Sequence, residues 1–400
     1  MDRDKARWRE GFYELSWWAF LLMVLFIPFP SPSWINSILL FWLALFILAK
    51  IVFREFRLDH GVIAFLAFLV LVLASCLFSI NIDKSMTYFR KDMIQTGIIY
   101  LSASQMLTDK KRLFLLSLVL LSSFTLAVVL SFGHYGRGHA LYGIFGHHTR
   151  YGKFLDLAMP LALALTVGGP TTVRCLALVF LFLGGYSLIL TLSRGAWVGC
   201  SAGVLGVVVR LRKILVTLGI LAVVFLVALV ILPRKGEIYN RFMSLIHLEE
   251  SAKKEKSLTH RRDFYKTALA LIREKPLLGW GYGRKTPRSI LKLKGEEWFT
   301  SRGLRPFKSH AHNTYLEMVL ETGLLGLLAF LLVLGVCLLN YLKVQPAHGE
   351  TFFLKTGAFF SILALLVHGL VTNFFQQPFI FLLFLYIALI NTEVRSETVP

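Results

Sequence analysis

Charged residues are scarce in this sequence. Asp, Glu, Lys and Arg make up 16% of its 400 residues, whereas about 25% is usual in soluble domains. Hydrophobic residues make up 56% of the chain, against about 45–50% apolar residues in an average soluble domain. The composition therefore excludes an ordinary soluble protein and indicates an integral membrane protein. The first apolar segment is not expected to be a cleaved signal peptide, because many more such segments follow it.

Cysteines and cofactor motifs are scarce as well. The chain has no Walker motif and no cluster of metal-ligating residues with ligand spacing. Its cysteines lie in or beside apolar stretches, without the spacing of a disulfide framework or a zinc site. They are Cys76, Cys175, Cys200 and Cys337. We expect them to be small buried apolar side chains, and we expect no cofactor and no metal.

Acidic residues are outnumbered by basic ones, and the formal net charge is +20. A strongly basic balance favours anionic partners. Phospholipid headgroups and phosphorylated substrates suit a chain of this composition. Nucleic acid is not expected to bind a chain that lies mostly in the membrane.

Apolar runs near the length of about 18–20 residues that crosses a bilayer are abundant. They predict an all-α polytopic membrane protein with about twelve transmembrane helices. The predicted spans lie roughly at 15–30, 33–52, 61–80, 92–107, 113–132, 151–168, 174–192, 195–210, 213–232, 322–342, 352–372 and 378–392.

Short basic loops predict the orientation of these spans. With twelve spans, the basic N-terminus and the basic stretches 50–57, 108–112 and 210–213 share one side with both chain ends, so that side is expected to be cytoplasmic. The other side receives the long segment 233–310. The chain is thus expected to comprise nine helices in 1–232, one large periplasmic loop in 233–310 and three helices in 311–400.

The long segment 233–310 contains 19 Lys and Arg against 8 Asp and Glu. Long loops cross the membrane largely regardless of charge, so a basic loop outside suggests that it binds an anion. Residues 261–275 read as an amphipathic helix that Pro276 ends. The basic residues of 284–309 show no helical period, and that stretch predicts either a solvated loop or a flap that touches headgroups or an anionic substrate.

Three glycines follow the expected amphipathic helix, in the stretch LLGWGYG at 277–283. They loosely resemble a nucleotide-binding fingerprint, but no strand precedes them. We interpret Gly279, Gly281 and Gly283 as positions where the backbone turns tightly or approaches a ligand.

Ionisable residues inside a membrane are functional candidates. Arg194, in LTLSRGAWVG, lies between two apolar runs and presents a planar fork that matches phosphate oxygens. The alternative is an arginine that extends to the interface. In FGHHTRYGKFLD (145–156), Arg150 on the outer face is suited to a headgroup or a phosphate. The adjacent histidines of that stretch indicate a metal only weakly.

The stretch SHAHNTYLEMVLETGLLG (309–326) places two histidines at the mouth of an apolar span. If a helix begins near His310, then Asn313, Glu317 and Glu321 line one face. Helix capping with an interfacial histidine is the simpler interpretation. Two histidines and a polar stripe beside a basic loop favour a site, in which His312 could act as a general base near neutral pH.

The arginine between apolar runs, the basic segment and the histidines fit a transfer reaction whose donor already carries an anionic leaving group. A lipid pyrophosphate is such a donor. Arginines would hold the pyrophosphate and stabilise the charge that develops as it departs. A histidine would deprotonate the acceptor hydroxyl.

Several segments together resemble the O-antigen ligase and O-antigen polymerase superfamily. They are HAHNTYLEMVLETGLLGLLAF (310–330), Arg261 with an aromatic residue four positions on and PLLGWGYG (276–283), SRGAWVG (193–199), and HGLVTNFF with the following FLLFLY (368–386). The resemblance covers most of the chain and is more specific in its C-terminal half. Tyr265 stands where the family commonly has tryptophan.

The resemblance implies a GT-C-like glycosyltransferase of the bacterial inner membrane. Its ligase branch moves a glycan from undecaprenyl pyrophosphate to a sugar of lipid A–core at the periplasmic face, without a metal. The family's catalytic histidine falls on His312, with His310 as the fallback. Its two phosphate-binding arginines fall on Arg194 and on Arg261 or the adjacent Arg262. We add Arg150 to the phosphate-binding candidates and Asn313 and Glu317 as orienting residues.

Two other functions stay open. The first is a polymerase that joins two lipid-linked repeats, because the shared motifs serve shared donor chemistry; a protein glycosyltransferase acting on pilin would be a further acceptor variant. One compact external loop favours the ligase. The second is a transporter of lipid or small anions, but Asp156 is the one plausible deep acid and most charges gather at one face.

Overall fold

The computed structural model describes residues 2–29, 33–134, 140–212, 256–307 and 310–393, with a few isolated residues between 219 and 243. This part of the chain is all-helical, which confirms the predicted fold class, and it contains no β-strand. The predicted span 213–232 and the first part of the predicted loop, 233–255, lie almost wholly outside the described residues.

The helices of the first half are α1 (Asp2–Phe26), α2 (Ser33–Val52), α3 (His60–Leu77), α4 (Ile82–Tyr88), α5 (Gln95–Met106), α6 (Lys110–Ser131), α7 (His148–Gly168), α8 (Thr171–Leu190) and α9 (Arg194–Leu211). Those of the second half are α13 (Lys256–Glu274), α14 (Thr286–Lys294), α15 (Glu296–Thr300), α16 (Thr314–Leu342), α17 (Glu350–His368) and α18 (Phe379–Asn391). A π-helical turn, Phe89–Ile94, joins α4 to α5. Short 3-10 turns occur at Gly143–Phe145 and Pro346–His348.

Within the described residues, seven helices are long and apolar enough to cross a membrane: α2, α3, α6, α8, α9, α16 and α17. The apolar helix α18 is shorter, at 13 residues. These helices indicate a multi-pass membrane protein. The number of about twelve spans stays a prediction, as do the GT-C-like relationship and the three-part division of the chain.

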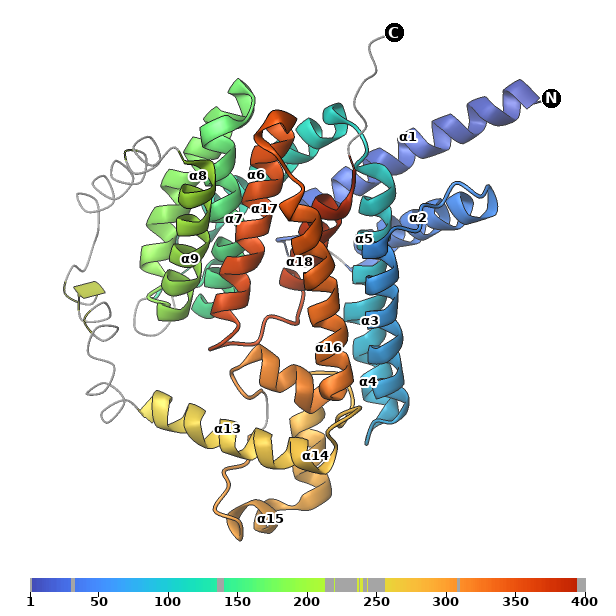
Figure 1. Cartoon of the computed structure of the whole chain (residues 1–400). Helices are drawn as coiled ribbons and strands as arrows, with labels where there is room; N and C mark the ends of the chain where they lie inside the picture. Colours follow the sequence, from blue (N-terminus) through green and yellow to red (C-terminus); the bar gives the residue numbers. More distant parts are fainter. Residues whose placement is uncertain are drawn as a thin grey trace.

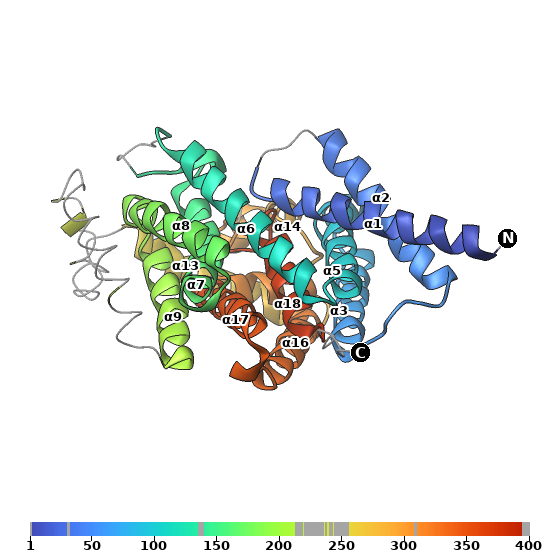
Figure 2. The same cartoon turned by 90° about the horizontal axis from the view of Figure 1, so that it is seen from above.

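The helices form one bundle, with α17 and α18 in its middle (Figures 1 and 2). Helix α17 packs against α7 and α9, α18 packs against α5, and α16 packs against α3. Helices α13, α14 and α15 gather at one end of the bundle, whereas the start of α1 points to the other (Figure 1). The starts of α7, α9 and α16 and the end of α17 share the end that carries α13–α15. The predicted orientation of the spans stays a prediction.

Helix α16 is broken near its start, at Gly323, where φ is 70° and ψ is −176°. The glycine-rich loop after α13 fills the break. The N–H groups of Trp280 and Gly281 donate to the carbonyls of Leu320 and Glu321, at 2.9 Å each. These bonds satisfy carbonyls that the kink has released from the helix.

The glycines of this loop allow the close approach. A Cβ at Gly279 would lie 2.6 Å from the carbonyl carbon of Glu321, a separation that ordinary contacts never reach. Gly279, Gly281 and Gly283 all have positive φ, which only glycine adopts readily. The tight backbone turns are confirmed, and the close approach is to α16; approach to a ligand stays a prediction.

The expected amphipathic helix forms as α13, where the continuously described part of the long segment begins. Its apolar face, with Ala268 and Leu271, packs against Trp280, Ile290 and Phe299 in a second core. The expectation of an irregular stretch over 284–309 is wrong in part, because α14 and α15 form there. Counting basic residues hid the amphipathic pattern, in which the apolar side chains of α14 pack on α13 while its Lys and Arg face outward.

The cysteines in the described residues are all free thiols. Cys76, Cys200 and Cys337 are buried, as expected. Cys175 is exposed on α8, so the expectation fails for this residue. Cys175 lies in an apolar stretch long enough to cross a membrane, which is why the sequence suggested that its side chain is buried.

Candidate active site

The histidine segment ends at a well-formed helix cap. Helix α16 begins at Thr314 rather than near His310, and Asn313 is its N-cap. The Asn313 side chain accepts hydrogen bonds from the N–H groups of Tyr315 and Leu316, at 2.9 and 3.0 Å. Its amide nitrogen donates to the carbonyl of Leu370 at 3.0 Å. Asn313 therefore joins the histidine segment to the turn that follows α17.

His312 adopts a left-handed backbone conformation, with φ of 58°, which few residues other than glycine favour. Helix α13 holds it from one side. The Tyr265 hydroxyl lies 3.3 Å from the carbonyl of His312 and 3.1 Å from the carbonyl of Leu370. The Phe264 ring stacks on the His312 ring at 6.1 Å, and the His310 ring lies 4.3 Å from the His312 ring.

Glu317 supports the same segment from within α16. It is 2% exposed, and its carboxylate accepts a hydrogen bond from the backbone N–H of Ala311 at 2.6 Å. Ala311 lies between the two histidines, so this bond fixes the backbone that carries both. Glu321, one turn on, accepts a hydrogen bond from the N–H of Gly283 at 3.0 Å. The two glutamates thus tie α16 to the histidine segment and to the glycine loop.

The two adjacent arginines of α13 have different environments. Arg261 precedes Phe264 and Tyr265 by three and four residues, so it shares the helix face that contacts His312. Its side chain is half-buried, whereas that of Arg262 is exposed. The charge of Arg261 acts on His312. The structure therefore brings Arg261 to the histidine segment, and it turns Arg262 toward solvent.

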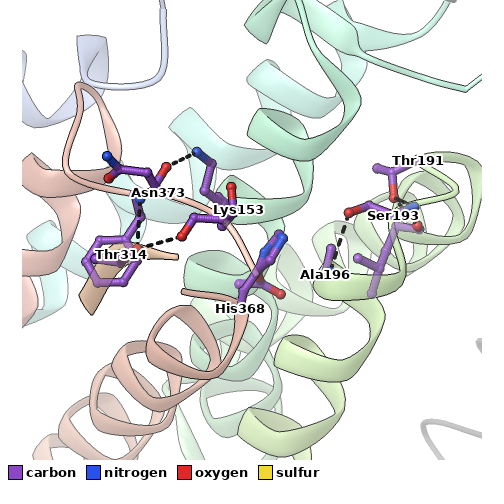
Figure 3. Close-up of polar contacts among 11 residues, drawn as sticks. Lys153, Thr191, Ser193, Ala196, Thr314, His368 and Asn373 are labelled. Atoms are coloured by element: carbon purple, nitrogen blue, oxygen red, sulfur yellow. Dashed lines mark hydrogen bonds and ion pairs between the residues drawn. The ribbon is translucent and has the colours of Figure 1, made fainter. Parts of the chain in front are cut away.

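The start of α7 adds further basic groups. His147 is the N-cap of α7, and its Nδ1 accepts a hydrogen bond from the N–H of Thr149 at 3.2 Å. Arg150 is exposed. Lys153 is 2% exposed, and its Nζ donates to the carbonyl of Asn373 at 2.7 Å (Figure 3).

Arg194 is the first residue of α9, and Ser193 caps the helix by accepting a hydrogen bond from the N–H of Ala196 at 3.5 Å. The next residue, Gly195, lies against the end of α17. A Cβ at Gly195 would be 2.6 Å from Cδ2 of His368. The structure thus places the start of α9 beside His368, and His368 lies between Ser193 and the group of Lys153 and Asn373 (Figure 3).

Burial and neighbouring positive charges favour the neutral form of the site histidines. Burial lowers the pKa of His312, and the charges of Arg261 and His147 lower it further. Burial lowers the pKa of His310 to about 3, with contributions from His312 and Lys153. Neutral imidazole is the form that can accept a proton.

Two features of this site were not selected from the sequence. The sequence places Lys153 in the outer stretch 145–156 but does not mark it as a site residue. His368 and Asp156 form a buried pair, with Nδ1 of His368 2.5 Å from Oδ2 of Asp156. The stretch HGLVTNFF carried a signal in its resemblance to a family motif, but nothing in the sequence links it to α7.

Metal binding finds no support in the part of the chain that the structure describes. There, His, Cys, Asp and Glu side chains form no group of three or more that could hold a metal ion. The histidines instead lie among cations, which a metal ion would not favour.

The fold and the site define a class: an all-helical, multi-pass membrane protein with basic and histidine side chains at one end of its bundle. Residues 178–331 match the family model described as O-Antigen ligase. The matched segment contains Arg194, Arg261, His312 and Glu317, but it ends before His368.

A curated relative is similar to part of the chain. It is an uncharacterised protein of Haemophilus influenzae, 27% identical over 165 residues. The match covers 39% of this chain and 40% of that protein. The chain therefore spans less than half of the length of this relative.

Proposed function

We propose that this protein is an O-antigen ligase. In this proposal it transfers a glycan from undecaprenyl pyrophosphate to a sugar hydroxyl of lipid A–core oligosaccharide. The reaction takes place at the periplasmic face of the bacterial inner membrane and needs no metal. The end of the bundle that carries α13–α15 is then the periplasmic end.

One observation carries the proposal: His312 is held between α13 and the turn after α17, with Arg261 on the adjoining helix face. A potential base and a phosphate-binding cation are thereby next to each other. They lie where the apolar helices end, which is where a lipid-linked pyrophosphate would present its sugar. The match of residues 178–331 to the O-Antigen ligase family model supports the same chemistry.

The proposed step is a single displacement at the anomeric carbon of the donor sugar. His312 takes the proton of the acceptor hydroxyl, and the acceptor oxygen forms a bond to the anomeric carbon. The bond between that carbon and the pyrophosphate oxygen breaks, and undecaprenyl pyrophosphate leaves with the electron pair. Arg194 and Arg261 would stabilise the negative charge that develops on the leaving oxygen.

The remaining residues would have supporting roles. Asn313 and Glu317 would orient His312 through the backbone contacts described above. His310 is the fallback base, although its deeper burial makes it the less accessible of the two. Arg150 would contact an outer phosphate or a headgroup, and Arg262 would contribute at most through the field of the basic loop.

The test is glycan transfer by purified protein in proteoliposomes with defined donor and acceptor. His312→Asn is the preferred variant, because asparagine tolerates a left-handed backbone and lacks a base of comparable strength. We expect loss of transfer at wild-type levels of inserted protein, whereas His310→Asn retains measurable transfer. Full transfer by His312→Asn would refute the assigned base.

The same assay tests which acceptor is used and whether the reaction needs a metal. Chain growth from the lipid-linked repeat alone, without added lipid A–core, would replace the ligase by the polymerase of the same superfamily. A pilin acceptor can be substituted for lipid A–core in a third arm. Activity that survives a chelator is expected, and its loss would overturn metal independence. Movement of donor across sealed liposomes without an acceptor would favour a transporter.

A further inference from the structure

The most deeply buried pair of an acid and a histidine in the described part of the chain is unused by the reaction proposed above. Asp156 on α7 is 0% exposed, and His368 at the end of α17 is 1% exposed. Oδ2 of Asp156 lies 2.5 Å from Nδ1 of His368. Buried polar groups are costly unless they are hydrogen-bonded, so a role is expected for this pair.

His368 is pressed against the helix that begins with Arg194. Two glycines of α9 leave room for it and for the Asp156 side chain, and a glycine of α7 lets α9 approach. A Cβ at Gly195 would lie 2.6 Å from Cδ2 of His368, one at Gly199 would lie 3.1 Å from Cβ of His368, and one at Gly152 would lie 2.5 Å from Cβ of Ala196 on α9. Small residues at such spacing let membrane helices approach closely. The imidazole therefore decides where the first turn of α9 can lie.

The residues directly after His368 hold the other half of the site. The carbonyl of Gly369 accepts a hydrogen bond from the N–H of Thr314 at 2.8 Å. The carbonyl of Leu370 accepts hydrogen bonds from Asn313 at 3.0 Å and from the hydroxyl of Tyr265 at 3.1 Å. The segment that follows His368 thus contacts both the histidine segment and α13.

His368 consequently lies between the two parts of the site (Figure 3). On one side is the start of α9, which carries Arg194. On the other are Asn313 and Tyr265, which hold His312 and the face of α13 that carries Arg261. The carboxylate of Asp156 fixes the imidazole ring by its bond to Nδ1, in the manner of a carboxylate that orients a histidine.

We propose that the Asp156–His368 pair is a positioning device that sets the place of Arg194 relative to His312. The inference rests on the proposed function for its kinetic consequences, but its structural part stands without it. Nε2 of His368 is buried beneath Gly195, so the ring does not touch substrate; it acts through the first turn of α9. A displacement of about 1 Å at a reacting centre lowers the rate by about 100-fold.

The test is a double-variant cycle of His368→Ala and Gly195→Ala. Each single change is expected to lower kcat/KM for the lipid-linked donor by about 10- to 100-fold, with the KM for the acceptor unchanged. A methyl group at position 195 collides with two atoms of the imidazole and lies 2.8 Å from Cγ2 of Val371, so removal of the imidazole relieves two of these three close contacts. The double variant should therefore be less defective than the product of the two single effects.

The matched control lies on the same two helices, about three turns from Arg194. A Cβ at Gly206 would be 2.1 Å from Cδ1 of Phe360 on α17. Gly206→Ala and Phe360→Ala disturb the same interface far from the site. They are expected to change thermal stability but to leave kcat/KM for the donor unchanged. A fall of the donor kcat/KM in these controls equal to that in Gly195→Ala would reduce the effect to general helix packing and overturn the proposal.

A conservative variant distinguishes loss of the hydrogen bond to His368 from misfolding of the protein. Asp156→Asn keeps an oxygen that can accept a hydrogen bond from Nδ1 of His368, whereas Asp156→Ala does not. We expect Asp156→Asn to retain most of the donor kcat/KM and Asp156→Ala to lose it. Equal loss in both would contradict a role through the orientation of His368.

A second readout does not depend on any substrate. Hydrogen exchange of the backbone amides of residues 195–197 should accelerate in His368→Ala, and not in Phe360→Ala. If the wild-type protein transfers no glycan but this exchange changes as expected, the proposed function fails and the positioning inference survives. If transfer is normal and the effects of His368→Ala and Gly195→Ala simply multiply, the positioning inference fails alone.

Discussion

The hydrogen bond between Glu317 and the backbone of Ala311 makes the sharpest prediction about the histidine segment. Ala311 is 0% exposed, and its N–H lies 2.6 Å from the carboxylate. Leaving a buried backbone N–H without its acceptor costs about 1–3 kcal/mol. If that energy holds the segment in its working conformation, its loss lowers kcat/KM by up to about 5- to 150-fold, because about 1.4 kcal/mol is a factor of ten.

Glu317→Leu and Glu317→Gln form a matched pair for this prediction. Leucine removes the acceptor and leaves a buried N–H unpaired, whereas glutamine keeps a carbonyl oxygen for Ala311. We expect Glu317→Leu to show the loss in kcat/KM together with faster amide exchange over residues 310–313, and Glu317→Gln to stay close to wild type. Glycan transfer in proteoliposomes and exchange of the same samples give the two readouts. Equal losses in both variants would refute the reasoning, because the charge and not the hydrogen bond would then matter.

Three further predictions concern single residues. Arg261→Ala should lower kcat/KM for the donor by about 10- to 100-fold, the worth of a charge-assisted hydrogen bond, and Arg262→Ala should leave it nearly unchanged; the reverse order would move the phosphate contact to Arg262. Because burial and nearby cations lower the pKa of His312, the neutral base persists below the usual value of about 6.5, so kcat/KM should stay constant as the pH falls through that value and decline only at lower pH. Gly323→Ala should destabilise the protein by about 1–3 kcal/mol, since its backbone conformation is one that side chains disfavour; Gly335→Ala, with no heavy atom within 4 Å of its added Cβ, is the control in a thermal unfolding assay.

Most of the helices and the polar stretch that carries the histidines could be predicted from local patterns. An amphipathic period at 261–275 predicted α13, and the apolar runs predicted most of the spans, because these signals depend on neighbouring residues in the sequence. The polar stretch 309–317 drew notice for the same reason. Its helix begins later than expected, because Asn313 is a better cap than His310.

The choice between Arg261 and Arg262 could not be made from the sequence. The two differ by one position, which is a rotation of about 100° around a helix. Only the contacts of Phe264 and Tyr265 with the histidine segment show which of them faces the site. The same contacts place α13 next to His312.

The sequence by itself determined the membrane class, the basic character of the segment 233–310 and the residue types that suit a lipid pyrophosphate. These follow from composition and spacing, which report on solvent and on local helix formation. The tertiary structure alone decided which groups meet. Asp156 and His368 are 212 positions apart, and they come together because the glycines of α7 and α9 allow α17 to pack close to both. Pairing across such a distance depends on the shapes of the packed helices, and no local pattern encodes it.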